Sequence, residues 1–251
     1  MRTYWILLRR ELGAYFVSLS GYVVIAAAAF LMGLGFLNMV IAVRGETMLV
    51  PVTELFYQTP YFWMIVLLTS PIITMRLFAL EKYAGTFETL MTTPVRDTAV
   101  VLAKFSAALV FFLVLWLPLA GCFFILRQMT GQGLPMDWGA VAATGLGILL
   151  LGCLFCSIGC FASSLTRTQT VAAMLGLALG VGLFLVGMLA GRPPAGLAAW
   201  QAAALAPFAL LDHLQDFARG VVDTRPIVFF LSLSALFLYL TLRVVESRHW
   251  K

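Results

Sequence analysis

The sequence predicts an all-α integral membrane protein with six transmembrane helices and an N-terminal interfacial amphipathic helix. Of its 251 residues, 62% are hydrophobic and only 11% are charged. Soluble domains are closer to half apolar and a quarter charged. Apolar runs of about 20 residues, long enough to cross a bilayer as a helix, recur along the whole chain. None of these runs shows the alternation of apolar and polar residues that barrel strands require.

The apolar runs define one transmembrane domain over residues 1–251, because the loops between them are too short to hold a second core. We interpret the runs as helices, since a backbone with unpaired polar groups cannot cross hydrocarbon. The last run is the shortest, and it spans only if 224–226 lies near the interface. The predicted spans are 21–43, 61–80, 105–126, 140–165, 171–191 and 227–242.

The distribution of lysine and arginine predicts the orientation. Eleven of the sixteen basic residues fall on the side that holds both termini and the segment 75–104, and five fall on the other side. By the positive-inside rule, both termini and this segment are cytoplasmic. The formal net charge of +5 is therefore a topology signal, and we expect no nucleic-acid partner.

The first 20 residues have the pattern of an amphipathic helix that lies on the cytoplasmic leaflet. Trp5 begins an apolar series at helical spacing, and Arg9, Arg10 and Glu11 occupy the remaining arc. Two interpretations stay open. The helix either only anchors the first span or also docks a partner.

The segment 81–104 is a charged, helix-capable island between two apolar runs. Its charges cannot lie in hydrocarbon without a large desolvation cost. Thr86 can cap a short helix with Glu88 in its first turn, and Pro94 ends it. An apolar stripe on this helix is formed by Phe87, Leu90 and Met91.

The fifth span carries two small-residue motifs that allow close helix packing. The glycines concerned are Gly176, Gly180, Gly187 and Gly191. The motif cannot separate packing within a subunit from packing between subunits. The segment 192–226 that follows is predicted to be external, with an amphipathic helix over 205–222.

No catalytic constellation or metal site is predicted. The two histidines, His213 and His249, fall on opposite sides of the membrane in this topology, and the sequence contains no glycine-rich nucleotide-binding loop. Cys153, Cys156 and Cys160 share a helix face, which would suit a soft metal. The same face continues a stripe of small residues, where cysteine is one more compact apolar residue.

The chain resembles the ABC-2 type permeases over essentially its whole length. The resemblance is carried by R-R-E-L-G-A-Y-F from Arg9, by F-A-L-E-K-Y-A-G-T-F-E-T-L-M-T-T-P-V from Phe78, and by R-G-V-V-D-T-R-P-I-V-F-F from Arg219. The gliding-motility-associated permease is the most similar subgroup, and the nitrous-oxide-reductase maturation permease is a neighbour.

This resemblance implies a multi-pass permease of the bacterial inner membrane. Two copies, identical or related, would bind two cytoplasmic ATPase subunits that hold ATP and magnesium, so no cofactor is expected in this chain. A periplasmic auxiliary protein is a further expected partner. Residues 2–18 match the family's connecting helix, and 84–93 match its cytoplasmic coupling helix.

The resemblance also implies the residues that contact the ATPase. The family's loop pattern is matched at Glu81, Gly85, Thr86, Glu88 and Pro94. Two departures are Leu80, where relatives often carry a second acidic residue, and Ala103, where they often carry glycine. The remaining expected contact residues are Lys82, Phe87, Leu90 and Met91.

Two functions remain open at this stage. In the first, the chain is the permease subunit of an ATP-binding cassette transporter and couples hydrolysis to movement of an unidentified substrate. In the second, it is an ATP-driven anchor or mechanical transducer that acts on a periplasmic or motility partner. A membrane-embedded enzyme is disfavoured because the spans lack a polar constellation.

Overall fold

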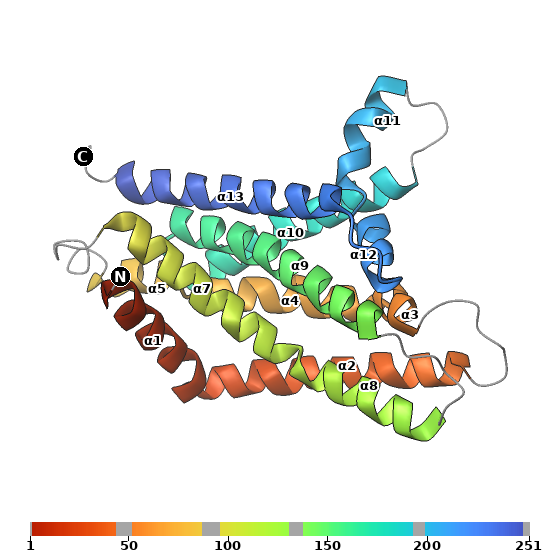
Figure 1. Ribbon diagram of the computed structural model, residues 1–251. Helices are drawn as coiled ribbons and strands as arrows, with labels where there is room; N and C mark the ends of the chain where they lie inside the picture. The colour runs from red at the N-terminus through yellow and green to blue at the C-terminus, as the bar shows by residue number, and fades with distance from the viewer. Residues whose placement is uncertain (1, 44–51, 87–95, 131–137, 193–198, 248–251) are drawn as a thin grey trace.

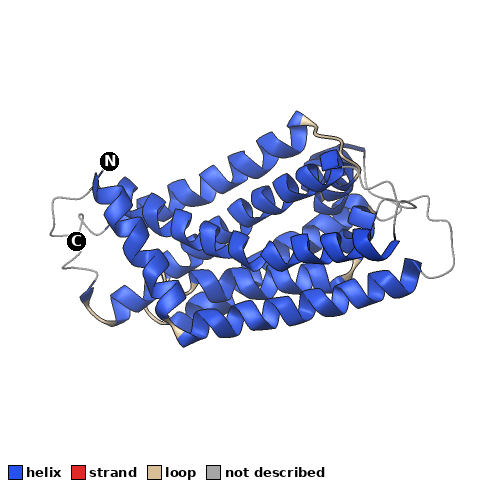
Figure 2. Ribbon diagram, turned by 60° about the horizontal axis from the view of Figure 1, so that its bottom comes forward, coloured by secondary structure: helices blue, strands red, loops and turns tan. Residues whose placement is uncertain are grey.

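The structure is a computed structural model that describes residues 2–43, 52–86, 96–130, 138–192 and 199–247. These residues form helices joined by short turns, with no strand among them (Figure 2). In chain order the helices are α1 (Arg2–Val17), α2 (Leu19–Val43), α3 (Val52–Gln58), α4 (Pro60–Thr74), α5 (Ala79–Tyr83), α7 (Asp97–Leu115), α8 (Leu117–Thr130), α9 (Trp138–Leu165), α10 (Gln169–Gly191), α11 (Ala199–Leu205), the 3₁₀ turn η2 (Ala206–Phe208), α12 (Leu210–Ala218) and α13 (Thr224–Glu246).

Six stretches of helix in the described part of the chain are long and apolar enough to cross a membrane, which confirms the six predicted spans. Two of them run further than expected at their charged ends. The third begins at Asp97 instead of 105, and the sixth covers Thr224–Glu246 instead of 227–242. Charged residues at a helix end can leave the hydrocarbon while the backbone stays helical, so apolar runs underestimate helix length.

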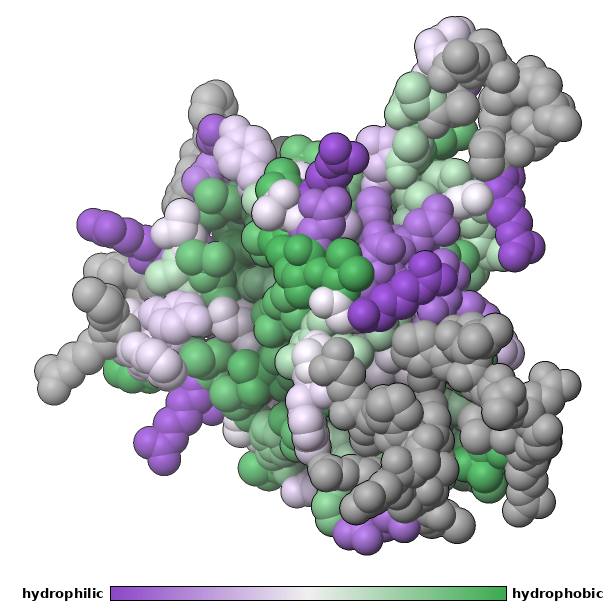
Figure 3. Space-filling model, turned by 45° about the vertical axis from the view of Figure 1, so that its right-hand side comes forward, coloured by the Kyte–Doolittle hydropathy of each residue, from purple (hydrophilic) through white to green (hydrophobic). Residues whose placement is uncertain are grey.

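The long helix α9 lies at the centre of the bundle and contacts α4, α7, α10, α12 and α13 (Figure 1). In its most apolar stretch, 72% of the residues are buried, compared with 22% in α2 and α10 and 17% in α13. The peripheral helices therefore present apolar side chains outward. Hydrophobic residues accordingly cover the middle of the face shown in Figure 3.

Proline removes a backbone hydrogen-bond donor from two of the spanning segments. Pro71 has no N–H for the helical ladder of α4, and Pro118 has none for the junction of α7 and α8. After α4 the chain makes a turn over 75–78 before α5 begins. The backbone N–H groups of Phe78 and Ala79 donate to Ser163 Oγ of α9, at 3.1 and 3.2 Å. This hydroxyl therefore ties the start of α5 to the central helix.

Small residues let the spans approach closely. A Cβ atom added at Gly159 of α9 would lie 2.0 Å from Thr74 Oγ1 of α4. The predicted packing glycines of α10 also face their own chain. A Cβ atom would lie 3.6 Å from Pro71 Cβ at Gly176, 3.3 Å from Phe155 at Gly180, and 3.0 Å from the Phe208 carbonyl oxygen at Gly187. At Gly191 it would lie 3.6 Å from Asp212.

The two ends of the bundle differ. Both termini lie at one end, together with α5 and the start of α7 (Figure 1). The other end carries α3, α11 and α12. The amphipathic helix expected over 205–222 is shorter than predicted: the chain there forms η2 and then α12, which buries Leu210, Leu214 and Phe217 on one face. Pro207 is the second residue of η2, and Gly220 at φ +81° follows the end of α12.

Candidate functional site

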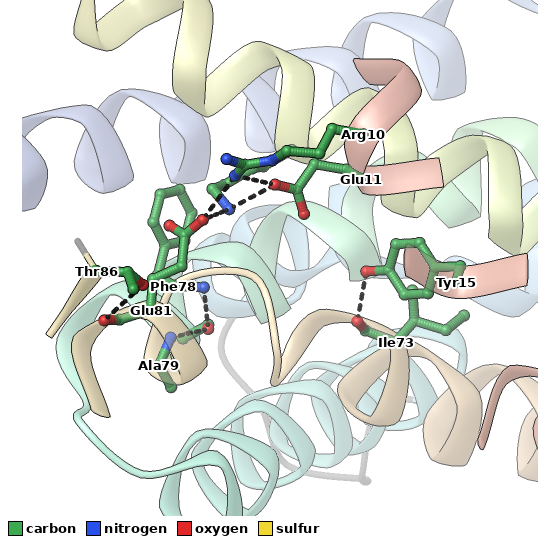
Figure 4. A network of polar contacts seen from close by, with 10 residues as sticks. Arg10, Glu11, Tyr15, Ile73, Phe78, Ala79, Glu81 and Thr86 are labelled. Carbon is green, nitrogen blue, oxygen red and sulfur yellow. Dashed lines mark hydrogen bonds and ion pairs between the residues drawn. The ribbon is translucent and has the colours of Figure 1, made fainter. Parts of the chain in front are cut away.

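Four charged side chains meet at the end of the bundle that carries both termini (Figure 4). They are Arg10 and Glu11 of α1, Glu81 of α5 and Lys104 of α7. Lys104 Nζ lies 3.0 Å from Glu11 Oε1 and 2.9 Å from Glu81 Oε1. The Nη2 atom of Arg10 lies 2.8 and 2.9 Å from the same two oxygens. Each cation thus bridges both carboxylates, and we call these four residues the charge network.

Packing of α1 along α7 places Glu11 beside Lys104. Leu7 of α1 packs in a small apolar cluster with Val100 and Ala103 of α7. One turn earlier on α1, Tyr4 Oη donates to Ser106 Oγ at 2.8 Å. Further along α1, the Tyr15 ring stacks on Phe111 with centroids 4.8 Å apart. These contacts fix the register of α1 on α7.

Three of the four side chains in the charge network are largely shielded from solvent, whereas that of Arg10 is about half exposed. The Lys104 side chain is 3% exposed, and those of Glu11 and Glu81 are 13% and 15% exposed. Burial opposes ionisation of Glu11, but Lys104 and Arg10 outweigh this effect and hold the pKa of Glu11 below its ordinary value. A hydrogen bond to Glu11 raises the pKa of Arg10. Each carboxylate of the network lies within 3.0 Å of the Lys104 ammonium group, and this pairing makes burial of Lys104 tolerable.

The region around α5 is tied to the remaining helices by hydrogen bonds. Lys82 Nζ donates to the Ser164 carbonyl oxygen of α9. On the other side of the turn before α5, Tyr15 Oη donates to the Ile73 carbonyl oxygen at 2.7 Å (Figure 4). Arg76 in that turn donates to Ser20 Oγ of α2 at 2.7 Å. A displacement of α5 and the turn before it would therefore also shift α1, α2, α7 and α9.

The residues predicted to contact an ATPase lie in different environments in the structure. Glu81 and Lys82 lie inside this bonded region and are not at an open surface. Gly85 and Thr86 are exposed on the turn that follows, with Gly85 at φ +69°. The other five predicted positions, Phe87, Glu88, Leu90, Met91 and Pro94, lie outside the described residues, as does most of the predicted coupling helix.

On the predicted interfacial helix, Arg10 and Glu11 belong to the charge network, whereas Trp5 and Arg9 are exposed. Sequence reasoning missed the roles of Lys104, Tyr15 and Ser163. Lys104 was assigned to the charged island, but its ammonium group is buried against α1 and α5. No spacing rule could have paired it with Glu11, since 93 residues separate them.

The described part of the chain holds no group of three or more histidine, cysteine, aspartate or glutamate side chains placed to bind a metal ion. Cys153, Cys156 and Cys160 are buried in α9 as unpaired thiols. His213 Nε2 lies 3.1 Å from the Pro207 carbonyl oxygen.

The fold and this site define a multi-pass α-helical membrane protein with an internally braced segment at the end that carries both termini. A family model described as ABC-2 family transporter protein matches residues 13–248, and the chain belongs to this family. No curated protein matches the chain. The chain is thus a permease subunit of an ABC transporter. Permeases of this family are non-catalytic, generally dimerise and work with a cytoplasmic ATPase.

Proposed function

We propose that the charge network transmits motion of a partner ATPase from the segment 81–104 into the spanning helices, and that this motion moves a substrate across the membrane. The observation that supports the proposal most directly is the bridging of α1, α5 and α7 by Lys104. Packed charges and helices move as units, so a push on α5 reaches all three helices together.

We place the network end of the bundle in the cytoplasm of a bacterial cell, with the protein in the inner membrane. This end carries most of the arginine and lysine residues, as cytoplasmic ends do. The partner ATPase would bind at the exposed turn around Gly85 and supply ATP and magnesium. The helix α1, with Trp5 and Arg9 exposed, offers it a second surface.

The assembly we propose contains a second permease copy, identical or related, and two ATPase subunits. Membership of the gliding-motility-associated subgroup is part of the proposal and rests on the sequence resemblance. An auxiliary periplasmic protein would meet the opposite end. The alternative, a mechanical transducer that acts on such a partner without moving a solute, uses the same ATP-driven motion.

Affinity purification of the tagged chain in mild detergent tests the proposal. We expect an ATP-binding subunit to co-purify, with vanadate-sensitive hydrolysis in the eluate. Stimulation of that hydrolysis by a small molecule would favour transport, whereas stimulation by a purified protein would favour transduction. A chain that purifies alone and inert, even after cross-linking through a cysteine introduced by Thr86→Cys, would contradict the coupling role.

A further inference from the structure

A cluster of aromatic side chains fills the core toward the end of the bundle opposite the termini. Four helices contribute to it: α3, α4, α7 with its C-terminal boundary, and α10. The Phe62 ring lies 5.3 Å, centroid to centroid, from both Trp63 and Trp116, and Trp63 lies 4.6 Å from Phe184. We define the aromatic cluster as Phe56, Phe62, Trp63, Phe112, Trp116 and Phe184.

Two hydrogen-bond donors in this cluster have no acceptor. The indole Nε1 atoms of Trp63 and Trp116 are buried without a partner in the part of the chain that the structure describes. Both side chains are deeply enclosed, with the residues only 6% exposed. The neighbouring Tyr57, by contrast, donates its hydroxyl to the Thr144 carbonyl oxygen at 2.8 Å. A buried donor without an acceptor is costly, and buried tryptophan usually finds a partner.

The cluster is covered on one side by α3, a helix of only seven residues. Polar contacts hold α3 to α12. Glu54 receives two hydrogen bonds from Arg219, at 2.8 and 2.9 Å, and Thr53 Oγ1 donates to the Ala218 carbonyl oxygen at 2.6 Å. The Arg219 side chain is about half exposed, so solvent competes for its ion pair. One extended residue, Thr59, separates α3 from α4.

We propose that the aromatic cluster is the cargo-binding surface of this permease, uncovered when α3 separates from α12, and that Trp63 and Trp116 donate hydrogen bonds to the acyl oxygen atoms of a long-chain ester or amide. The inference rests on the proposed transport function. After α3 has carried Phe56 away, the other five aromatic rings supply apolar contact area and carry no charge, which favours an apolar chain. The two unpartnered donors require acceptor oxygens on the ligand.

Photolabelling of the full chain in dodecyl maltoside, a detergent without ester groups, tests this site. The probe is the methyl ester of a long-chain fatty acid that carries a diazirine, and mass spectrometry maps its attachment. We expect labelled peptides that contain Phe62 and Trp63 or Leu115 and Trp116. Methyl palmitate should compete for this labelling, whereas hexadecane, which has the same apolar chain but no acceptor, should compete weakly.

The variants Trp63→Phe and Trp116→Phe should each lower cluster labelling about threefold to tenfold, the effect of losing one hydrogen bond. Trp5→Phe, which changes an exposed tryptophan on α1, is the matched control and should leave it unchanged. Arg219→Gln should raise labelling by loosening α3, and it removes no aromatic ring.

Labelling confined to outward-facing positions such as Val228 and Leu231 of α13, or equal competition by hexadecane, would overturn the inference and leave the cluster as packed core. Because the assay uses the permease without its ATPase, this result is independent of the co-purification experiment. A labelled cluster in a chain that binds no ATPase would keep the ligand site and overturn the proposed coupling.

Discussion

Lys104 shows most clearly how a single residue organises the candidate site. Its ammonium group lies within 3.0 Å of carboxylates from two other helices and is almost fully shielded from water. A buried cation of this kind is tolerated only while its partners are present. We therefore expect loss of one member of the network to lower the stability of the protein strongly, whereas loss of an ion pair at the surface should change it little.

Replacing Lys104 with methionine, which has a similar length and no charge, should destabilise the protein by about 3 kcal/mol, because two buried carboxylates would then share only Arg10. Thermal unfolding of the detergent-solubilised protein measures the change. Arg243→Gln is the matched control, since Arg243 pairs with Glu246 at an exposed position and should contribute little. Equal unfolding temperatures for the two variants would show that the network is not a stabilising unit.

The lowered pKa of Glu11 predicts that the stability of the folded protein decreases at acidic pH. Its folded-state pKa is lowered below the ordinary value of 4.5, so its stabilising contribution is complete above that value and is lost as the pH falls through the lowered pKa. The stability difference between the wild type and Glu11→Gln should be largest near neutral pH and should shrink below pH 4.5. Unfolding temperatures measured over this range test it, and a difference that stays constant with pH would contradict it.

At the scale of the element, α5 depends on a side chain from another helix for its start. Ser163→Ala should cost about 1–2 kcal/mol, because the N–H groups of Phe78 and Ala79 would lose this acceptor. Ser157→Ala is a close control. Ser157 is also fully buried in α9, but its hydroxyl donates only to the Leu154 carbonyl oxygen of the same helix. Similar losses of unfolding temperature in both variants would mean that the Ser163 hydroxyl does not hold the start of α5 in place.

The elements also show what could be predicted from sequence. The six spans could be predicted because the thickness of the bilayer sets the number of consecutive apolar residues that a spanning helix needs. The short helices were harder, because α3 and α12 are set by contacts between distant segments, such as that of Glu54 with Arg219. The charge network was unpredictable for the same reason. Its members were visible as charges, but only the packing of α1 on α7 brings them together.

At the scale of the whole molecule, the helices bonded around α5 form one part, and the exposed turn at Gly85 forms another. Helices α1, α7 and α9 are bound to α5 by the network and by Ser163, whereas the turn at Gly85 projects from this bonded region. A force applied at the turn would therefore be transmitted without first breaking the contacts of α5. This division predicts that coupling can be lost while the bundle stays folded.

Gly85→Ala tests that division. Gly85 adopts φ +69°, which disfavours a side chain, yet an added Cβ would meet nothing within 4 Å. The substitution should therefore strain or reshape the turn at a cost of about 1–2 kcal/mol and leave the spans packed. Gly145→Ala on α9 is the control, since its Cβ also meets nothing within 4 Å but its site is far along the chain from the turn.

We expect the Gly85→Ala permease to bind its ATPase and to lose the change in hydrolysis rate that the wild-type permease imposes on that ATPase, while Gly145→Ala keeps it. Steady-state hydrolysis by the purified assembly, compared with that of the ATPase alone, measures the coupling. Because both variants should unfold within a few degrees of the wild type, a selective loss would arise from the turn itself. Unchanged coupling in Gly85→Ala would move the ATPase contact away from this turn.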